Sequence, residues 1–330
     1  MSLDFSVSVN PLGMPDAVRE ALIVHVGEYT RYPDPECREL RTAIAAHENV
    51  PENRVLCGNG AADLIYRLCY ALAPRKALVC APTFSEYERA LEQVGCQAAH
   101  HILTVGNGFA LTEDIEERLV PGIDTLFLCH PNNPTGRLIP ADLLKRILRR
   151  AHKNNTTVIV DECFLDFTDG VSAGQYLEET PGLAVLKAFT KIYAMAGLRL
   201  GYLLTSDRAL INSVNASAQC WSVSVPAQIA GVAALGCADW LDATRRLVEE
   251  ERRFLSECLS GLGITVFPSD ANYLLMRCEQ PLYAPLLERV ILIRSCENFT
   301  GLGASYYRVG AKARKENSCL VQAVKEIING

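Results

Sequence analysis

At residues 190–202 the chain reads Thr190-Lys191-Ile192-Tyr193-Ala194-Met195-Ala196-Gly197-Leu198-Arg199-Leu200-Gly201-Tyr202, with a lysine at a turn and an arginine eight residues later, where a strand begins. A lysine amine that is desolvated beside a second cation has a lowered pKa and can hold an aldehyde as a Schiff base. A guanidinium offers a phosphate two parallel donors. The stretch therefore suits an aldehyde cofactor that carries a phosphate. Taken alone, it is more simply a solvated loop lysine followed by a strand-edge cation, so the interpretation depends on other motifs.

An earlier strand supplies a carboxylate. Residues 157–162 read Thr157-Val158-Ile159-Val160-Asp161-Glu162, an unbroken apolar run as expected for a strand that is covered on both faces. A buried carboxylate is costly unless a cation meets it. The protonated pyridine nitrogen of pyridoxal phosphate is such a cation, and the aspartate keeps the ring an electron sink. A turn-capping role is the simpler explanation for Asp161 by itself.

Two turn sequences complete the pattern. Residues 55–65 read Val55-Leu56-Cys57-Gly58-Asn59-Gly60-Ala61-Ala62-Asp63-Leu64-Ile65, a strand, a glycine turn and a helix start whose backbone N–H groups can cradle a phosphate. A dinucleotide site is the rival interpretation, but Asp63 fills the third glycine position of G-x-G-x-x-G. The loop His130-Pro131-Asn132-Asn133-Pro134-Thr135-Gly136 follows a strand, where open α/β sheets bind ligands. It is also an ordinary turn sequence.

In this order the four motifs resemble those of the fold-type I pyridoxal phosphate enzymes, in the histidinol-phosphate aminotransferase branch of the aspartate aminotransferase superfamily. Within that branch the chain resembles the threonine-phosphate decarboxylases of cobalamin biosynthesis. The stretches that carry this resemblance are Asp4-Phe5-Ser6, Asn10-Pro11-Leu12-Gly13, Thr190-Lys191-Ile192-Tyr193-Ala194, Ala271-Asn272-Tyr273-Leu274-Leu275, Ile291-Leu292-Ile293-Arg294-Ser295-Cys296 and Tyr306-Tyr307-Arg308-Val309. The resemblance spans essentially the whole chain. It implies decarboxylation of L-threonine O-3-phosphate to (R)-1-aminopropan-2-yl phosphate.

The alternation of apolar strands and amphipathic helices predicts an α/β fold with a mostly parallel, doubly wound sheet. Strands are expected near residues 54–57, 77–81, 125–130, 157–162, 183–188 and 199–205, with a helix over 141–153. A long surface helix from about residue 238 leads to a smaller α+β lobe with strands near 264–267, 272–277, 291–294 and 306–310 and a terminal helix. We therefore expect an N-terminal arm (1–25), a large cofactor-binding domain (26–237) and a small C-terminal domain (238–330).

Composition restricts the classes of function. The 330 residues are 49% hydrophobic, enough for a large core, and the net charge of −6 argues against a nucleic-acid surface. The thirteen cysteines form no C-x-x-C pair, and no signal peptide or membrane-spanning run is visible. We therefore expect a reduced, cytoplasmic enzyme without a metal site, membrane anchor or nucleic-acid partner. A phosphorylated substrate must then be captured by local arginines.

The resemblance assigns a role to individual residues. Lys191 and Asp161 are the implied catalytic residues. The other implied cofactor contacts are Ala61, Ala62, Phe84, Asn133, Thr190, Arg199 and, from the other subunit of a homodimer, Tyr32. The implied substrate contacts are Asn10, Gly13, Asn133, Arg294 for the phosphate and Arg308 for the α-carboxylate. Ordinary roles remain open for several of them, such as a core phenylalanine for Phe84 and a surface-turn tyrosine for Tyr32.

Three departures from the family pattern bear on the substrate. Phe164 stands where aminotransferases usually place a tyrosine that bonds the cofactor phenolate, and this favours the decarboxylase. Ala188 lacks the side-chain hydroxyl that family members often have at this position as a hydrogen-bond donor to the cofactor phosphate. The chain starts close to Asp4-Phe5-Ser6, without the His-Gly-Gly segment found upstream in many threonine-phosphate decarboxylases. A histidinol-phosphate or related aminotransferase is therefore the second hypothesis. A regulatory module that binds the cofactor without turnover is the third.

Overall fold

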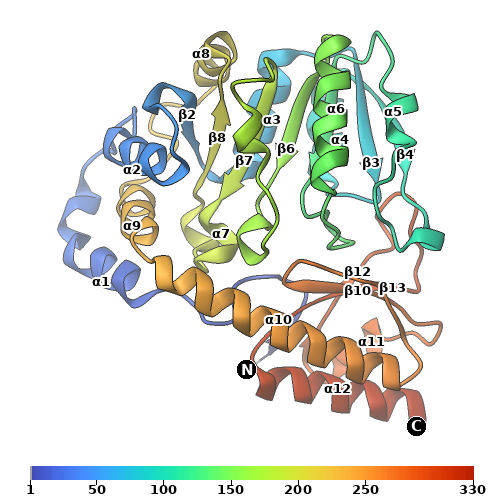
Figure 1. Cartoon of the computed structure of the whole chain (residues 1–330). Coiled ribbons are helices and arrows are strands. Elements are labelled where there is room, and N and C mark those ends of the chain that lie inside the picture. The colour runs from blue at the N-terminus through green and yellow to red at the C-terminus, as the bar shows by residue number, and fades with distance from the viewer. Residues whose placement is uncertain (1) are drawn as a thin grey trace.

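The computed structural model describes residues 2–330 and is organised around a seven-stranded sheet (Figure 1). Its strands, in spatial order, are β2 (Val55–Gly58), β8 (Gly201–Thr205), β7 (Leu183–Ala188), β6 (Thr157–Asp161), β5 (Thr125–Cys129), β3 (Lys76–Ala81) and β4 (Gln97–Ile102). Only β8 runs antiparallel to its neighbours, β7 and β2. The predicted mostly parallel, doubly wound sheet is therefore confirmed.

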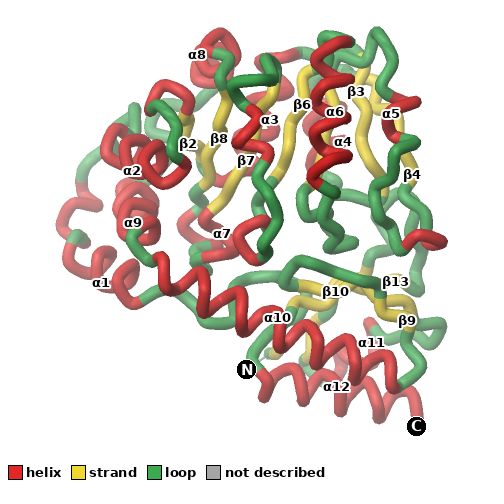
Figure 2. Tube along the Cα trace, in the orientation of Figure 1, coloured by secondary structure: helices red, strands yellow, loops and turns green. Residues whose placement is uncertain are grey.

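Helices cover both faces of this sheet. The helices of the large lobe are α1 (Asp16–Val24), α2 (Arg38–Glu48), α3 (Gly60–Leu72), α4 (Glu86–Gln93), α5 (Ile115–Arg118), α6 (Ala141–Lys153), α7 (Phe189–Ile192), α8 (Arg208–Ala216) and α9 (Val225–Leu235). Helix α6 lies in front of the sheet in Figure 2. The long helix α10 (Ala238–Gly261) then leads away to the small lobe.

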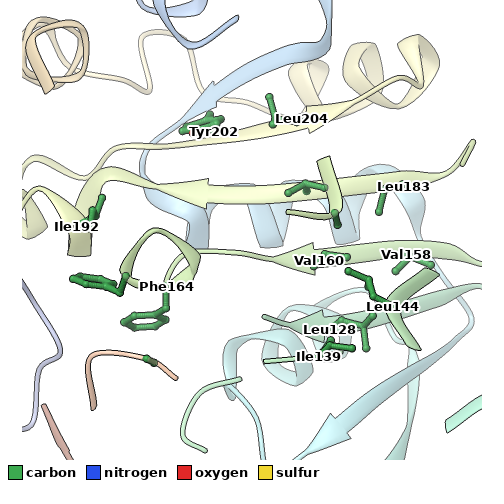
Figure 3. Close-up of a cluster of buried hydrophobic side chains, with 14 of the residues drawn as sticks. Leu128, Ile139, Leu144, Val158, Val160, Phe164, Leu183, Ile192, Tyr202 and Leu204 are labelled. Carbon is green, nitrogen blue, oxygen red and sulfur yellow. The ribbon is translucent and has the colours of Figure 1, made fainter. Parts of the chain in front are cut away.

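The strands are apolar along their whole length because alternate side chains enter two different cores. Leu126, Leu128, Val158 and Val160 pack with α6 in one core (Figure 3), whereas Phe127 and Ile159 pack with α3, α4 and α8 in the other. Asp161 lies two residues after Ile159 in the same strand, so its side chain points to the same face of the sheet, the one covered by α3.

The small lobe contains a four-stranded antiparallel sheet beneath the large one (Figure 1). Its strands are β12 (Arg294–Ser295), β13 (Tyr306–Gly310), β10 (Tyr273–Arg277) and β9 (Thr265–Val266), and its helices are α11 (Tyr283–Glu288) and α12 (Arg314–Asn329). The first strand of the chain, β1 (Leu3–Asp4), pairs with β11 (Ile291–Leu292) in this lobe. The N-terminal arm thus crosses from the small lobe to the large one.

Most of the sequence-based strands agree with the structure, but the short β1 was not predicted, and the strand expected near 291–294 is divided into β11 and β12, which belong to different sheets. Strand β4 was not predicted; its sequence, Gln97-Ala98-Ala99-His100-His101-Ile102, is polar because it forms the edge of the sheet. The strand expected from residue 199 starts at Gly201, because Arg199 has a left-handed backbone with φ 57°. The boundary at 237/238 coincides with the start of α10, and the division into three domains remains a proposal.

Candidate active site

A cavity of about 210 Å³ lies where β5, β6 and β7 end, against the start of α3 and the small-lobe strand β13. Its walls are formed by Ser8, Ala61, Ala62, Ile65, Phe84, Cys129, Asn133, Asp161, Cys163, Phe164, Ala188, Thr190, Lys191, Arg199 and Arg308. Parallel strands present their carboxyl ends at one edge of a sheet, which is where ligands bind in open α/β folds. The four motifs that are separate in the sequence therefore meet here.

Lys191 reaches the cavity from α7, the short helix that follows β7. Burial lowers the pKa of its amine, and the nearby guanidinium groups of Arg308 and Arg199 lower it further. The N-terminal arm fixes the backbone of this lysine, because the backbone N–H of Asn10 donates to the Lys191 carbonyl at 3.0 Å. An amine with a lowered pKa is more often neutral, which is the form that attacks an aldehyde.

Asp161 is 5% exposed and lies at the end of β6. Its carboxylate accepts a hydrogen bond from the Tyr87 hydroxyl at 2.6 Å and one from the Cys163 backbone N–H at 3.0 Å. Burial raises the pKa of Tyr87 well above its usual value, and the Asp161 charge adds to this effect. The tyrosine therefore stays protonated and holds the carboxylate in one orientation at the wall of the cavity.

The first turn of α3 forms another part of the cavity wall and is suited to an anion. The unpaired N–H groups at a helix start attract a phosphate, and Ala61 and Ala62 supply them here. Gly60 has φ +81°, and a Cβ atom there would lie 2.8 Å from Nη2 of Arg199, so only glycine lets the guanidinium approach this turn. Thr190, in the short helix α7 that follows β7, is also part of the cavity wall and supplies a hydroxyl.

The side chain of Arg308 enters from β13 and is held by two other elements. Its Nη1 donates to the Asn133 side-chain oxygen, and its Nη2 donates to the Ser6 carbonyl at 2.7 Å. Its Nε is buried and has no hydrogen-bond partner among residues 2–330; the Ser8 hydroxyl, on the same cavity, also has none. These two buried polar groups are therefore available to hydrogen-bond a polar ligand in the cavity.

Four sequence-predicted residues lie outside the cavity walls. Arg294 faces Arg308 across the β12–β13 pair and donates to Asn298 at 2.8 Å. The Asn10 side chain is buried and donates to the Ile192 carbonyl (2.6 Å) and the Thr244 hydroxyl (2.7 Å). Gly13 forms a turn at φ +84°. Tyr32 is 78% exposed and stacks on Trp221 with ring centroids 4.4 Å apart. The structure thus gives Asn10 a structural role, and the four ligand assignments stay predictions.

Some lining residues were not found from the sequence. Ser8 lies in the N-terminal arm, whose course through the fold the sequence does not predict. Nothing in Val7-Ser8-Val9 shows whether the serine hydroxyl contacts a ligand or is an ordinary side chain of a strand. Cys163 lies in the turn after β6, beyond the alternation of the strand, so that pattern gave no signal for it. A periodic signal was available for Ile65, one turn beyond the α3 start.

These residues fit a pyridoxal phosphate. The first turn of α3, Thr190 and Arg199 would hold its phosphate, Asp161 would meet its ring nitrogen, and Lys191 would bind its aldehyde carbon. Phe84 lines the same cavity and packs edge-on against Tyr87 at 5.6 Å, which leaves its ring available to the cofactor. A fold-type I α/β sheet with a lysine, an aspartate and a helix-start anion site at one edge defines the class of pyridoxal phosphate enzymes.

Comparisons with known proteins agree. The Aminotransferase class I and II family profile matches residues 1–327. The chain is 42% identical to the threonine-phosphate decarboxylase of Salmonella typhimurium, over 99% of this chain and 92% of that protein. The chain therefore belongs to the aminotransferase class I and II family, and the predicted cofactor, pyridoxal 5′-phosphate, is confirmed.

Solved structures show the same fold. The histidinol-phosphate aminotransferase of Clostridium acetobutylicum superimposes with a TM-score of 0.93 at 28% identity and covers 99% of both chains. The L-threonine-O-3-phosphate decarboxylase of Porphyromonas gingivalis gives a TM-score of 0.88 at 26% identity and covers 99% of this chain and all of that one. Among residues 2–330 no helix has the length and apolar character needed to cross a membrane.

A buried ionic cluster lies beside the active-site strands. The side chain of Glu162 accepts hydrogen bonds from the Ser172 hydroxyl and the Ala173 backbone N–H, both at 2.6 Å. The Lys187 ammonium lies 4.0 Å from Glu162 but bonds Glu48, at 2.8 Å, which the Tyr202 hydroxyl also bonds. Burial raises the pKa of Glu162 to about 7, because the attraction of Lys187 does not offset the desolvation.

This raised pKa predicts a pH-dependent stability. Between pH 4.5 and about 7 Glu162 binds a proton in the folded protein but not in the unfolded chain. The resulting contribution to the free energy of unfolding is therefore complete below pH 4.5 and is lost as the pH rises through about 7. Glu162→Gln should remove this pH dependence. From pH 5 to pH 8 the free energy of unfolding in urea should fall by about 1–3 kcal/mol more in the wild type than in Glu162→Gln. The exposed Glu257→Gln is the control. Parallel pH profiles of wild type and Glu162→Gln would contradict the assignment.

Proposed function

We propose that the protein is a pyridoxal phosphate-dependent carboxy-lyase that converts L-threonine O-3-phosphate to (R)-1-aminopropan-2-yl phosphate in cobalamin biosynthesis. The observation that carries the proposal is the 42% identity to the Salmonella typhimurium decarboxylase over 99% of this chain. The geometry supports it, because the substrate has an α-carboxylate and a phosphate and the small lobe presents two arginines on neighbouring strands.

Arg308 is suited to the α-carboxylate. Asn133 and the Ser6 carbonyl hold its two terminal nitrogens, so the planar guanidinium is fixed before substrate arrives. Preorganised donors lose little conformational entropy when the substrate binds. With the carboxylate held at Arg308 and the amine next to Lys191, the orientation of the bonds at Cα is set by the chain. When bound, the cofactor supplies the electron sink for the pair left at Cα.

Arg294 is suited to the phosphate. Residues 294 and 308 are directly opposed in an antiparallel pair, which places their side chains on the same face of the small sheet. Among residues 2–330 the Arg294 guanidinium donates a hydrogen bond to Asn298 and lies 5.2 Å from the centre of the Phe299 ring, whereas Arg308 donates two hydrogen bonds. A phosphate that extends from the substrate past Arg308 would meet this second cation.

Substitution of the two arginines separates these roles. Arg308→Ala should reduce kcat/KM for every amino-acid substrate, by about 10²-fold or more, because a hydrogen-bonded buried charge pair contributes several kcal/mol. Arg294→Ala should raise KM for L-threonine O-3-phosphate more than for L-threonine. Arg277→Ala, at an exposed arginine of β10, is the control. Equal losses on both substrates in Arg294→Ala would move the phosphate site elsewhere, for example to the arm at Asn10 to Gly13.

The reacting proton is assigned to Lys191. After the carboxylate leaves as CO2, Cα must be protonated, and the Lys191 amine is the titratable group of the cavity that also binds the aldehyde. With the cofactor bound, the Asp161 carboxylate would face the ring nitrogen and would favour its protonated form. Phe164, packed edge-on against Tyr273 at 5.0 Å, gives the cavity an apolar wall in place of a tyrosine hydroxyl.

The proposal includes a cytoplasmic homodimer. Tyr32 and Trp221 form an exposed aromatic stack, and the exposed Ile23, Val24 and Val26 lie at the end of α1 and the start of the short 3-10 helix Val26–Thr30 that follows it. Exposed apolar side chains gathered on one segment favour a protein interface. A second copy seated there could bring its Tyr32 to the phosphate end of the cavity. Light scattering tests this, since a monomer at working concentration would contradict it.

A further inference from the structure

A second cleft, separate from the active site, holds three cysteines. It has a volume of about 170 Å³ and lies between the start of α2, strand β2, helix α3 and the segment that follows α8. Cys37, Cys57 and Cys220 line it together with Arg41 and Arg67, and it shares no wall residue with the catalytic cavity. Nothing in the proposed reaction uses these five side chains.

Cys37 and Cys57 both line this cleft, and only 5% and 6% of the two residues are exposed. The interaction between the two thiols lowers the pKa of Cys37 and raises that of Cys57, and burial raises the Cys57 pKa further. The pair therefore contains one potential thiolate and one retained proton.

Cations and a helix start favour the thiolate form of Cys37. Arg41 acts on both sulfurs and Arg67 on Cys57, and each arginine has a buried N–H, at Nε of Arg41 and Nη2 of Arg67, without a hydrogen-bond partner among residues 2–330. Cys37 is also the residue that precedes α2, where the helix dipole stabilises a negative charge. Burial of Cys37 and the carboxylates of Asp34 and Glu36 oppose this effect and raise its pKa.

We propose that Cys37 and Cys57 form a redox-active dithiol that a peroxide converts to an intramolecular disulfide. The Cys37 thiolate attacks the peroxide, so an S–O bond forms, the O–O bond breaks, and one molecule of water is released after protonation. The Cys57 sulfur then attacks the oxidised Cys37 sulfur; an S–S bond forms, the S–O bond breaks, and the Cys57 proton leaves with the oxygen as a second water. Two thiols are oxidised and one hydrogen peroxide is reduced.

The position of the pair gives the disulfide a structural consequence. Cys57 is bonded to Gly58, which opens the turn that leads to the phosphate-binding start of α3. A Cβ atom at Gly58 would lie 2.5 Å from the Leu64 side chain, so this turn is closely packed. The oxidised protein would have the start of α2 covalently joined to the strand that carries the turn.

Peptide mapping of the cofactor-loaded protein tests the proposal. The protein is treated with hydrogen peroxide, free thiols are alkylated, and the peptides are analysed by mass spectrometry. We expect a linked pair of peptides that contain Cys37 and Cys57, formed about tenfold faster than the thiol of the exposed Cys319 is lost, and reversed by dithiothreitol. Cys37 and Cys57 remaining alkylatable when Cys319 is oxidised, or Cys37 linked to Cys220, would overturn the proposal.

Variants assign the order of events. In Cys57→Ser, Cys37 should stop at the sulfenic acid, which dimedone traps, whereas Cys37→Ser should give neither the disulfide nor the dimedone adduct at Cys57. Cys220→Ser, which removes the third thiol of the same cleft, should form the disulfide at the wild-type rate. Dimedone labelling of Cys57 in Cys37→Ser would contradict the assigned roles. The wild-type mapping decides the proposal even if a variant does not fold.

Discussion

Lys191→Ala is expected to lower turnover about 10⁴-fold or more, because the substitution removes both the covalent attachment of the cofactor and the proton donor to Cα. The amine is positioned for both tasks at the end of β7, and its pKa is lowered by burial and by Arg308 and Arg199. Purified wild-type protein should be yellow, and borohydride should fix the cofactor irreversibly to Lys191. The variant should bind the cofactor without this attachment.

A matched lysine and a small amine make the Lys191 test specific. Lys315→Ala, at an exposed lysine of α12, should keep wild-type turnover and labelling. Added methylamine should restore part of the lost activity in Lys191→Ala, since it replaces the missing base. Borohydride labelling of any other lysine in wild type, or turnover of Lys191→Ala within tenfold of wild type, would contradict the assignment.

Asp161→Ala should reduce kcat by about 10²- to 10⁴-fold at saturating cofactor, because removing one partner of a buried ion pair costs about 3–5 kcal/mol. Without the carboxylate the ring nitrogen loses its proton and the ring is a weaker electron sink. Tyr87→Phe removes only the 2.6 Å hydrogen bond that orients Asp161 and should cause a smaller loss.

The cofactor's spectrum separates this role from a loss of folding. Asp161→Ala should keep the far-ultraviolet circular dichroism of wild type and retain a cofactor that borohydride can fix to Lys191. Asp166→Ala, five residues along the chain and outside the cavity walls, is the comparison for local damage. Near-normal kcat in cofactor-saturated Asp161→Ala would show that this carboxylate does not support the ring nitrogen.

The sequence predicted the large sheet and most of the cavity because both depend on local patterns. Val158, Ile159 and Val160 had to form a covered strand, and the next residue, Asp161, had to lie at its end. Gly58 ends a strand in the same way, and Gly60 and Lys191 follow shortly after strand ends. Parallel strands collect such residues at one edge, so their order along the chain was enough to bring them together.

The remaining features depend on contacts between distant segments. The residues around Asn10 do not reveal that its side chain donates hydrogen bonds to Ile192 and Thr244, which lie 182 and 234 residues further along the chain. Arg294 and Arg308 are opposed only because β12 and β13 pair in one register. Strand β4 escaped prediction because an edge strand can be polar. No periodicity in the sequence reports these pairings.

The most direct test of the proposed reaction supplies the purified, cofactor-loaded protein with two substrate systems in parallel. One contains L-threonine O-3-phosphate, and the other contains histidinol phosphate with 2-oxoglutarate. We expect release of CO2 in equal amount to (R)-1-aminopropan-2-yl phosphate in the first and no glutamate in the second. Glutamate formation from histidinol phosphate and 2-oxoglutarate, without CO2 release from L-threonine O-3-phosphate, would rule out the decarboxylase and identify an aminotransferase.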